Sequence, residues 1–264
     1  MWNTVKSVRQ ICRRDALRRF LLGLIPVVFF GGVVGSWYDY SFSGVTGSEM
    51  FGTVMQLFPM ALVSIVMVNT ARICGWDLTD KTANYEILYG SKRAAVYFGR
   101  FLVALGKNLL YVAAVTALAP AVCTLWSGWG RSLAFSDALV HYALLFPVVF
   151  RMVCTAAAIT FLVMSDIGGI ALSFLLPIFA TLFYMFAREL GGADFPAWIF
   201  SVSTLTAAED FTNTTTGFAD GAEYLIYKTA LDARLIVQTL ISAFGVGIAL
   251  LAASYAVYRR RDLS

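Results

Sequence analysis

Side chains capable of acid–base, nucleophilic or metal chemistry are few in this chain and form no recognisable catalytic pattern. His141 is the single histidine and stands in an apolar stretch, so no H-E-x-x-H metal motif exists. Tyr38 and Asp39 have no matching aspartate motif in a later apolar segment, as paired-aspartate catalysis within a membrane would require. We therefore predict that the chain is not an enzyme and holds no catalytic residue, cofactor or metal of its own.

The nearest approach to a phosphate-binding loop runs from Gly99 to Gly106, Lys107 and Asn108. Such a loop has the form G-x-x-x-x-G-K-[ST], because its backbone amides cradle the phosphates and its hydroxyl binds Mg²⁺. Here the glycine spacing differs, asparagine replaces the hydroxyl residue, and the stretch lies within a long apolar segment. The chain is therefore not expected to hydrolyse ATP.

Arg151 is a charge in the middle of an apolar stretch, Leu-Leu-Phe-Pro-Val-Val-Phe-Arg-Met-Val-Cys. An arginine at mid-bilayer costs roughly 2.5–3.5 kcal/mol on insertion scales, so this side chain should face a bundle interior or a polar cavity. One interpretation is that it contacts a transported substrate or pairs across a dimer. The other is that it pairs with backbone carbonyls or with an acid such as Glu49, and the sequence leaves both open.

The elements that must position these residues are long apolar segments. Hydrophobic residues make up 59% of the 264 residues and charged residues 14%, which exceeds what a water-soluble domain of this length carries. Since a spanning helix needs about 20 mostly apolar residues, we predict a single all-α, polytopic membrane domain over residues 1–264 with six transmembrane helices. The predicted spans are residues 20–38, 51–73, 101–125, 139–164, 167–187 and 235–258.

The charges are distributed unevenly between the two predicted sides of the membrane. Most of the 20 basic residues fall in the N-terminal segment, between the second and third spans, and at the C-terminal end. The loops on the other side carry mainly acids. By the positive-inside rule we predict an integral membrane protein with both termini cytoplasmic. We expect the basic face to meet solvent or lipid, not nucleic acid.

Residues 1–19 combine apolar and basic side chains at helical spacing. Trp2, Val5 and Val8 recur on one side of the helical wheel, while Lys6 and Arg9 fall mainly elsewhere. This pattern is typical of an amphipathic helix in the headgroup plane, whose arginines meet anionic membrane lipid. The alternative is a basic tail that only fixes the topology.

Residues 74–98 form a charged cytoplasmic insert between the second and third predicted spans. Thr79 or Asp80 could cap a short helix by offering a side-chain oxygen to free backbone N–H groups. Gly90 could end that helix in a left-handed conformation, and Ser91 would then cap a second helix that runs into the third span. Such a pattern suits a protruding contact for a partner and a plain connecting loop equally well.

Residues 188–233 form a long outer segment before the last predicted span. Residues 195–203 are apolar but too short to cross a membrane, and Pro196 suits the first position of a helix. We predict a re-entrant or interfacial helix there. Residues 209–221, rich in Thr, Asp and Gly, are predicted to be a solvated loop.

Residues 77–101 read Asp-Leu-Thr-Asp-Lys-Thr-Ala-Asn-Tyr-Glu-Ile-Leu-Tyr-Gly-Ser-Lys-Arg-Ala-Ala-Val-Tyr-Phe-Gly-Arg-Phe. This stretch resembles the segment between the second and third spans of ABC-2-type transporter permeases. In that family an acid, a Thr, a Leu, a Gly, a Ser-Arg-like pair and a basic residue that opens the third span tend to recur in this order. The layout of the chain is similar too, with a basic N-terminal helix, six spans, a long outer segment and a short basic end.

The resemblance implies the permease subunit of an ABC transporter in a bacterial cytoplasmic membrane, exporting a peptide, drug or lipid-like substrate. ATP and magnesium would bind a separate ATP-binding subunit, and a second permease copy or a homologue would complete the pathway. The helix around residues 79–89 would be the coupling helix that docks into that ATPase. A stand-alone channel or secondary carrier is the alternative. The implied coupling residues are Thr79, Asp80, Glu86, Leu88, Gly90 and Arg93, and Arg151 is the pathway candidate.

Overall fold

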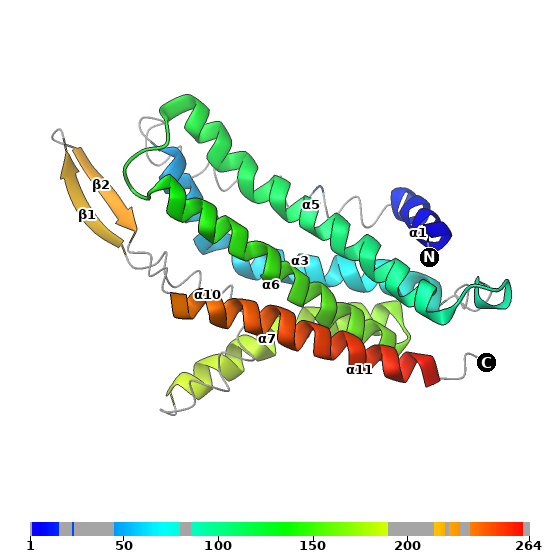
Figure 1. Ribbon diagram of the computed structural model, residues 1–264. Helices are drawn as coiled ribbons and strands as arrows, with labels where there is room; N and C mark the ends of the chain where they lie inside the picture. Colours follow the sequence, from blue (N-terminus) through cyan, green and yellow to red (C-terminus); the bar gives the residue numbers. More distant parts are fainter. Residues whose placement is uncertain are drawn as a thin grey trace.

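The computed structural model describes residues 2–15, 23, 45–79, 86–189, 214–219, 222–227 and 233–260. Within these ranges the chain is mostly helical (Figure 1). The predicted first span, residues 20–38, falls almost wholly outside the described residues, as does the predicted re-entrant helix. The helices are α1 (Trp2–Arg14), α3 (Gly47–Thr79), α5 (Arg93–Ser127), α6 (Phe135–Val163), α7 (Asp166–Glu189), α10 (Ala233–Leu240) and α11 (Gly247–Arg260), with a π-helical segment η1 (Ile241–Val246) between the last two.

The long helices form one bundle with two distinct ends (Figure 1). One end carries α1, the connection between α3 and α5, and the end of α11, and is called the terminal end below. The other carries a β-hairpin and is called the hairpin end. Placement of α1 and the end of α11 together agrees with an even number of spans. The assignment of the terminal end to the cytoplasm stays a prediction.

Three helical segments among the described residues are long and apolar enough to cross a membrane, namely α5, α6 and the continuous Ile241–Arg260. They contain the predicted spans 101–125, most of 139–164 and the greater part of 235–258. The predicted spans 51–73 and 167–187 fall within helices α3 and α7. The structure thus shows a helical protein with several potential membrane-crossing helices, and the full count of six stays a prediction.

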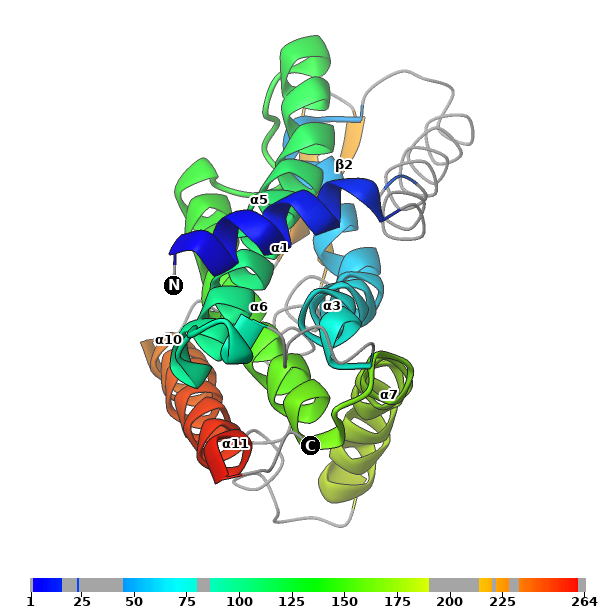
Figure 2. The same ribbon diagram turned by 90° about the vertical axis from the view of Figure 1, so that its right-hand side faces the viewer.

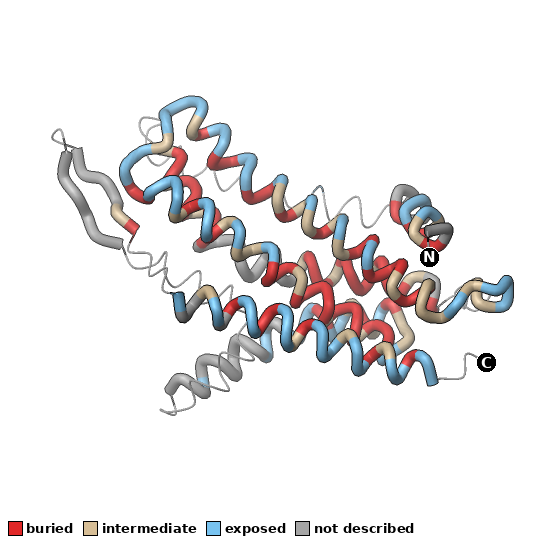
Figure 3. The backbone as a smooth tube through the Cα atoms, viewed as in Figure 1, coloured by how far each residue is buried: buried red, intermediate tan, exposed pale blue. Residues whose placement is uncertain are grey.

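Helix α6 forms the centre of the bundle. Seen from the terminal end, α5, α3, α7 and α11 surround it and α1 crosses the bundle (Figure 2). Buried residues concentrate along α6 and the faces that its neighbours turn toward it (Figure 3). Val153, Cys154, Ala156 and Ala157 are fully buried. Small side chains matter here because helices in lipid associate by close packing, with no hydrophobic gain over contact with lipid.

The predicted N-terminal helix is confirmed over Trp2–Arg14. Its buried side chains include Thr4, Val8 and Cys12, one turn apart, and α1 packs against α5. Lys6 and Arg9 are exposed on its other side. The helix is therefore docked on the bundle by its apolar face, and the contact of its basic face with lipid stays a prediction.

The all-α prediction is wrong in the outer segment, where the structure contains an antiparallel β-hairpin. Strands β1 (Thr214–Ala219) and β2 (Ala222–Tyr227) pair from Thr214 opposite Tyr227 to Ala219 opposite Ala222. The predicted loop over residues 209–221 overlooked β-branched Thr214–Thr216 and the following Phe218. It also overlooked the Asp-Gly pair between the strands, a strong sequence signal for a two-residue hairpin turn.

The last helix has a local π-helical turn. Segment η1 continues from α10 into α11, so the three elements form one rod (Figure 1). A π turn is rare and is found mostly as a single widened turn within an α-helix, often at a functional site. Gly247, just after it, lies close to α6, since an added Cβ would meet Phe150 Cε1 at 3.3 Å. The widened turn thus faces the central helix.

Candidate coupling and pathway sites

The predicted coupling insert is partly described by the structure. Helix α3 continues through Thr79, so Thr79, one of the two predicted caps, is a helical residue and does not cap a new helix. Asp80 and residues 81–85 lie outside the described residues. The described remainder is a short helical stretch at residues 86–88, a turn at Tyr89 and Gly90, and two residues that lead into α5. Residues 86–92 are called the terminal-end turn below.

Gly90 ends the helical stretch as predicted. Its φ of 93° lies in the left-handed region that favours glycine. The N–H of Gly90 donates to the Ile87 carbonyl and the N–H of Ser91 to the Glu86 carbonyl, both at 3.0 Å. This pair of bonds is a Schellman motif, which satisfies carbonyls at a helix end. The turn therefore has a defined backbone conformation and is more than a plain connecting loop.

The prediction that Ser91 caps the next helix is wrong. Lys92 is the N-cap of α5, with an extended backbone (φ −66°, ψ 138°) and no side-chain cap bond. Its carbonyl accepts the first helical bonds, from the N–H groups of Ala95 and Val96. The reason is local: Ser91 already belongs to the Schellman closure, so one further extended residue is needed before a helix can begin.

Glu86 fixes the terminal-end turn to the bundle. Its Oε2 lies 3.3 Å from Nη2 of Arg100, whose side chain is fully buried, while Glu86 is 26% exposed. The Ser7 hydroxyl of α1 donates to Glu86 Oε1 at 3.5 Å. One carboxylate thus joins the turn to α5 and α1, and it neutralises a guanidinium that would be costly to bury alone.

The tip of the terminal-end turn is apolar and exposed. Leu88 is 78% exposed and Tyr89 is 89% exposed. On the side of α5, the Arg93 guanidinium donates to the Arg259 carbonyl at the end of α11 at 2.8 Å. The turn therefore presents two large apolar side chains on a base that is bonded to α1 and α5, and α5 is in turn bonded to α11.

Aromatic packing connects the start of α5 with α6 and α11. The ring of Tyr97 lies 4.2 Å from that of Phe161 and 5.6 Å from that of Tyr258, centroid to centroid. The Tyr97 hydroxyl also lies 2.6 Å from the Ser254 hydroxyl. Since all four side chains are buried, a displacement of the start of α5 would be transmitted to both helices.

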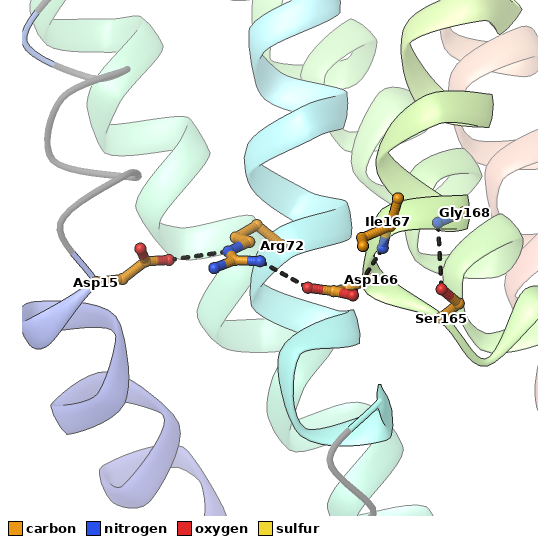
Figure 4. Close-up of polar contacts among 6 residues, drawn as sticks. All are labelled: Asp15, Arg72, Ser165, Asp166, Ile167 and Gly168. Carbon is orange, nitrogen blue, oxygen red and sulfur yellow. Dashed lines mark hydrogen bonds and ion pairs between the residues drawn. The ribbon is translucent and has the colours of Figure 1, made fainter.

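A second charged cluster joins three elements near the terminal end (Figure 4). The Arg72 guanidinium of α3 contacts Asp15 Oδ2 at 3.2 Å, just after α1, and Asp166 Oδ2 at 2.6 Å, at the start of α7. It also lies over the Trp76 ring, 4.1 Å from its centroid. Ser165 caps α7 by accepting the Gly168 N–H at 3.2 Å. We call Asp15, Arg72 and Asp166 the arginine hub.

Arg151 lies in the interior, as the sequence predicts. It is 7% exposed, and its guanidinium donates to the Ser242 hydroxyl of η1. The acid suggested by the sequence, Glu49, is engaged at the hairpin end. There its carboxylate accepts the Thr46 N–H at 3.0 Å, in a capping-box contact, and the Ser132 hydroxyl at 3.3 Å. Arg151 is thus joined to the widened turn of the last helix.

A buried polar cluster that was not predicted from the sequence lies between α3 and α5. Asn69 donates to the Asn108 side-chain carbonyl at 2.5 Å, and Asn108 donates to the Thr70 hydroxyl at 2.8 Å. All three are buried. Polar side chains of this kind hold helices together in membranes by interhelical bonds. Two asparagines in adjacent predicted spans were the available signal.

Comparison with known proteins adds no family assignment. The chain matches no known protein-family model and no curated protein. Among the described residues, no group of three or more His, Cys, Asp or Glu side chains is placed to hold a metal ion. The evidence for a function therefore comes from the geometry of the terminal-end turn and from the resemblance of its sequence.

Proposed function

We propose that this chain is the membrane-spanning permease subunit of an ABC transporter, which exports a peptide, drug or lipid-like substrate. The observation that carries the proposal is the terminal-end turn, which holds Leu88 and Tyr89 exposed on a base fixed by Glu86 and Arg100. An exposed tyrosine on a rigid support is a typical anchor for a partner's pocket, and Leu88 adds apolar surface beside it. The resemblance of residues 77–101 assigns that partner as an ATP-binding subunit.

In this proposal the partner binds ATP and magnesium and supplies the free energy, and this chain transmits the movement. A push on Leu88 and Tyr89 would reach α5 through the Glu86–Arg100 pair and α11 through Arg93. The displacement would also reach α1 through the Ser7–Glu86 contact, and the arginine hub would transmit it from there to α7. These are rigid contacts between helices, and a helical bundle responds to them by discrete shifts of packed elements.

The transport pathway is proposed to form between this chain and a second permease copy or a homologue. Arg151 and η1 are the proposed pathway elements because they place a buried guanidinium beside a widened helical turn. Large exposed apolar side chains on α7 and α11, such as Phe179 and Ile248, leave surface for the second subunit and for membrane lipid.

The test is to purify the tagged chain from its native membrane in mild detergent and to measure bound proteins and vanadate-sensitive ATP hydrolysis. A stoichiometric ATP-binding subunit is expected. The double variant Leu88→Ser, Tyr89→Ser should bind the ATP-binding subunit about 30-fold more weakly, since loss of a central anchor costs about 2 kcal/mol or more.

Leu110→Ser is the matched control, because Leu110 is also highly exposed but lies in the middle of α5. It should retain the ATPase as wild type does. A chain that purifies alone from several mild detergents would contradict the proposal and favour a stand-alone channel or carrier. Equal retention by the Leu88/Tyr89 variant and the control would contradict the docking role of the turn.

A further inference from the structure

A cavity lies between α5 and α6 at the hairpin end of the bundle. Its volume is about 430 Å³, within the roughly 300–1,000 Å³ of typical small-molecule sites. Pro120 and the small side chains of Ala117 and Ala121 form its wall on α5. Tyr142 of α6 and Trp129 of the connecting loop contribute aromatic surface. The proposed ATPase contact lies at the other end of the molecule (Figure 1).

Every polar side chain that lines this cavity is already hydrogen-bonded to backbone. The Thr116 hydroxyl donates to the Val112 carbonyl and the Thr124 hydroxyl to the Pro120 carbonyl, both at 2.6 Å. The remaining two bonds are from the Tyr142 hydroxyl to Ala113 O at 2.8 Å and from Trp129 Nε1 to Leu133 O at 2.7 Å. A water molecule needs two to four polar partners. An apolar occupant is therefore favoured.

The position of the cavity indicates which apolar molecule is available. Helices α5 and α6 are two of the three described segments able to cross a membrane, and the lining residues Leu125 and Leu139 are exposed. The rim carries Trp129 and Phe135, in a T-shaped contact at 5.1 Å. Tryptophan and tyrosine, represented here by Trp129 and Tyr142, concentrate at the membrane–water interface, so the cavity would meet the ends of lipid chains nearest their headgroups.

The loop that contributes Trp129 to the cavity also carries a positive charge. Arg131 is exposed and stands in the loop between the lining residues Trp129 and Phe135. We propose that the cavity is a binding site for a phospholipid, with one acyl chain between α5 and α6 and an anionic headgroup at Arg131. The proposal does not depend on the transport function proposed above.

The test uses quenching of Trp129 fluorescence by phospholipids brominated on the acyl chain, in vesicles that contain the full chain. The signal of Trp129 is the difference between wild type and Trp129→Phe. Brominated lipid should quench this signal, and brominated phosphatidylglycerol should do so with about five-fold higher apparent affinity than brominated phosphatidylcholine, as expected for one basic residue near a headgroup. Arg131→Gln should abolish that preference.

Filling the cavity provides the decisive control. Ala117→Phe places a ring in the cavity and should reduce the quenching of Trp129 at least two-fold. Ala114→Phe makes the same change on an exposed position of α5 outside the cavity and should leave it unchanged. Equal quenching in the two variants would overturn the proposal. The proposal would also be overturned if brominated lipid did not quench Trp129 in wild type and the Ala117→Cys variant cross-linked to a second copy. That result would assign the cavity to an interface between two copies of the chain.

Discussion

Replacement of Arg72 by Met tests whether the arginine hub stabilises the terminal end of the bundle. The side chains of Arg72, Asp15 and Asp166 are only 20%, 6% and 12% exposed, respectively. Loss of the guanidinium would leave two largely buried carboxylates without it, and removal of one partner from a buried ion pair costs roughly 3–5 kcal/mol. Because Arg72 keeps some contact with solvent, we expect about 3 kcal/mol.

The single acid variants should cost less than Arg72→Met, because each keeps one ion pair. Asp166→Asn loses a charged contact at 2.6 Å but retains an oxygen for the Ile167 N–H, which Asp166 Oδ1 accepts at 2.7 Å. We expect a cost of about 1.5 kcal/mol, the lower end for hydrogen bonds to charged groups. Asp15→Asn, with the longer contact of 3.2 Å, should cost no more.

Thermal unfolding in detergent, followed with a thiol-reactive dye, measures these differences. The four cysteines are free and buried, so they should react only when the bundle opens. About 3 kcal/mol corresponds to a decrease in Tm of about 6–12 °C for a chain of this size. Arg260→Met, an exposed arginine at the end of α11, is the control and should shift Tm little. A Tm decrease for Arg72→Met no larger than that for the control would refute the reasoning. So would Tm decreases for Asp166→Asn and Asp15→Asn as large as that for Arg72→Met.

Two further changes test the terminal-end turn and the interior arginine. Gly90→Ala should cost about 1–2 kcal/mol, because its φ of 93° disfavours any Cβ although nothing lies within 4 Å. The control Gly106→Ala, within helix α5 and also in open space, should stabilise the chain by about 0.5–1 kcal/mol. Tm shifts of the same sign for Gly90→Ala and Gly106→Ala would contradict the assignment of the cost to the positive φ of Gly90. Arg151→Ala should slow transport by the assembled complex, because it removes the buried guanidinium of the proposed pathway. Ser242→Ala removes only the hydroxyl that this guanidinium contacts and should slow transport less. Unchanged transport with intact assembly in Arg151→Ala would remove Arg151 from the pathway.

Local signals in the sequence predicted local structure well. The glycine at residue 90 was sufficient to predict a left-handed helix end, because few other residues adopt that conformation at low cost. Apolar length predicted the positions of α3, α5, α6, α7 and the last helix, and three of these are long and apolar enough to cross a membrane. Ser91 was wrongly predicted to be the N-cap of α5. Its N–H completes the Schellman motif that ends the preceding helical stretch, so α5 begins one extended residue later, with Lys92 as its N-cap.

Contacts between distant residues could not be predicted in the same way. The arginine hub joins residues 15, 72 and 166. From the sequence alone, each of its two acids had several basic residues on the same predicted side of the membrane as equally reasonable partners. The burial of Arg151 was predicted from its apolar surroundings, but its partner Ser242 is an ordinary residue in the last predicted span. The hairpin was missed although its signal was local, since threonines beside Asp and Gly also suit a solvated loop.

The π-helical turn gives the last helix a place where one residue can be lost without rotating the residues that follow. Deletion of one residue from an α-helix rotates all later residues by about 100°, which would turn buried Ser254 and Tyr258 away from α5 and α6. In η1 the widened turn already holds a surplus residue. Deletion of exposed Gly245 would convert it to an ordinary α-helical turn and leave the aromatic packing of α11 in phase.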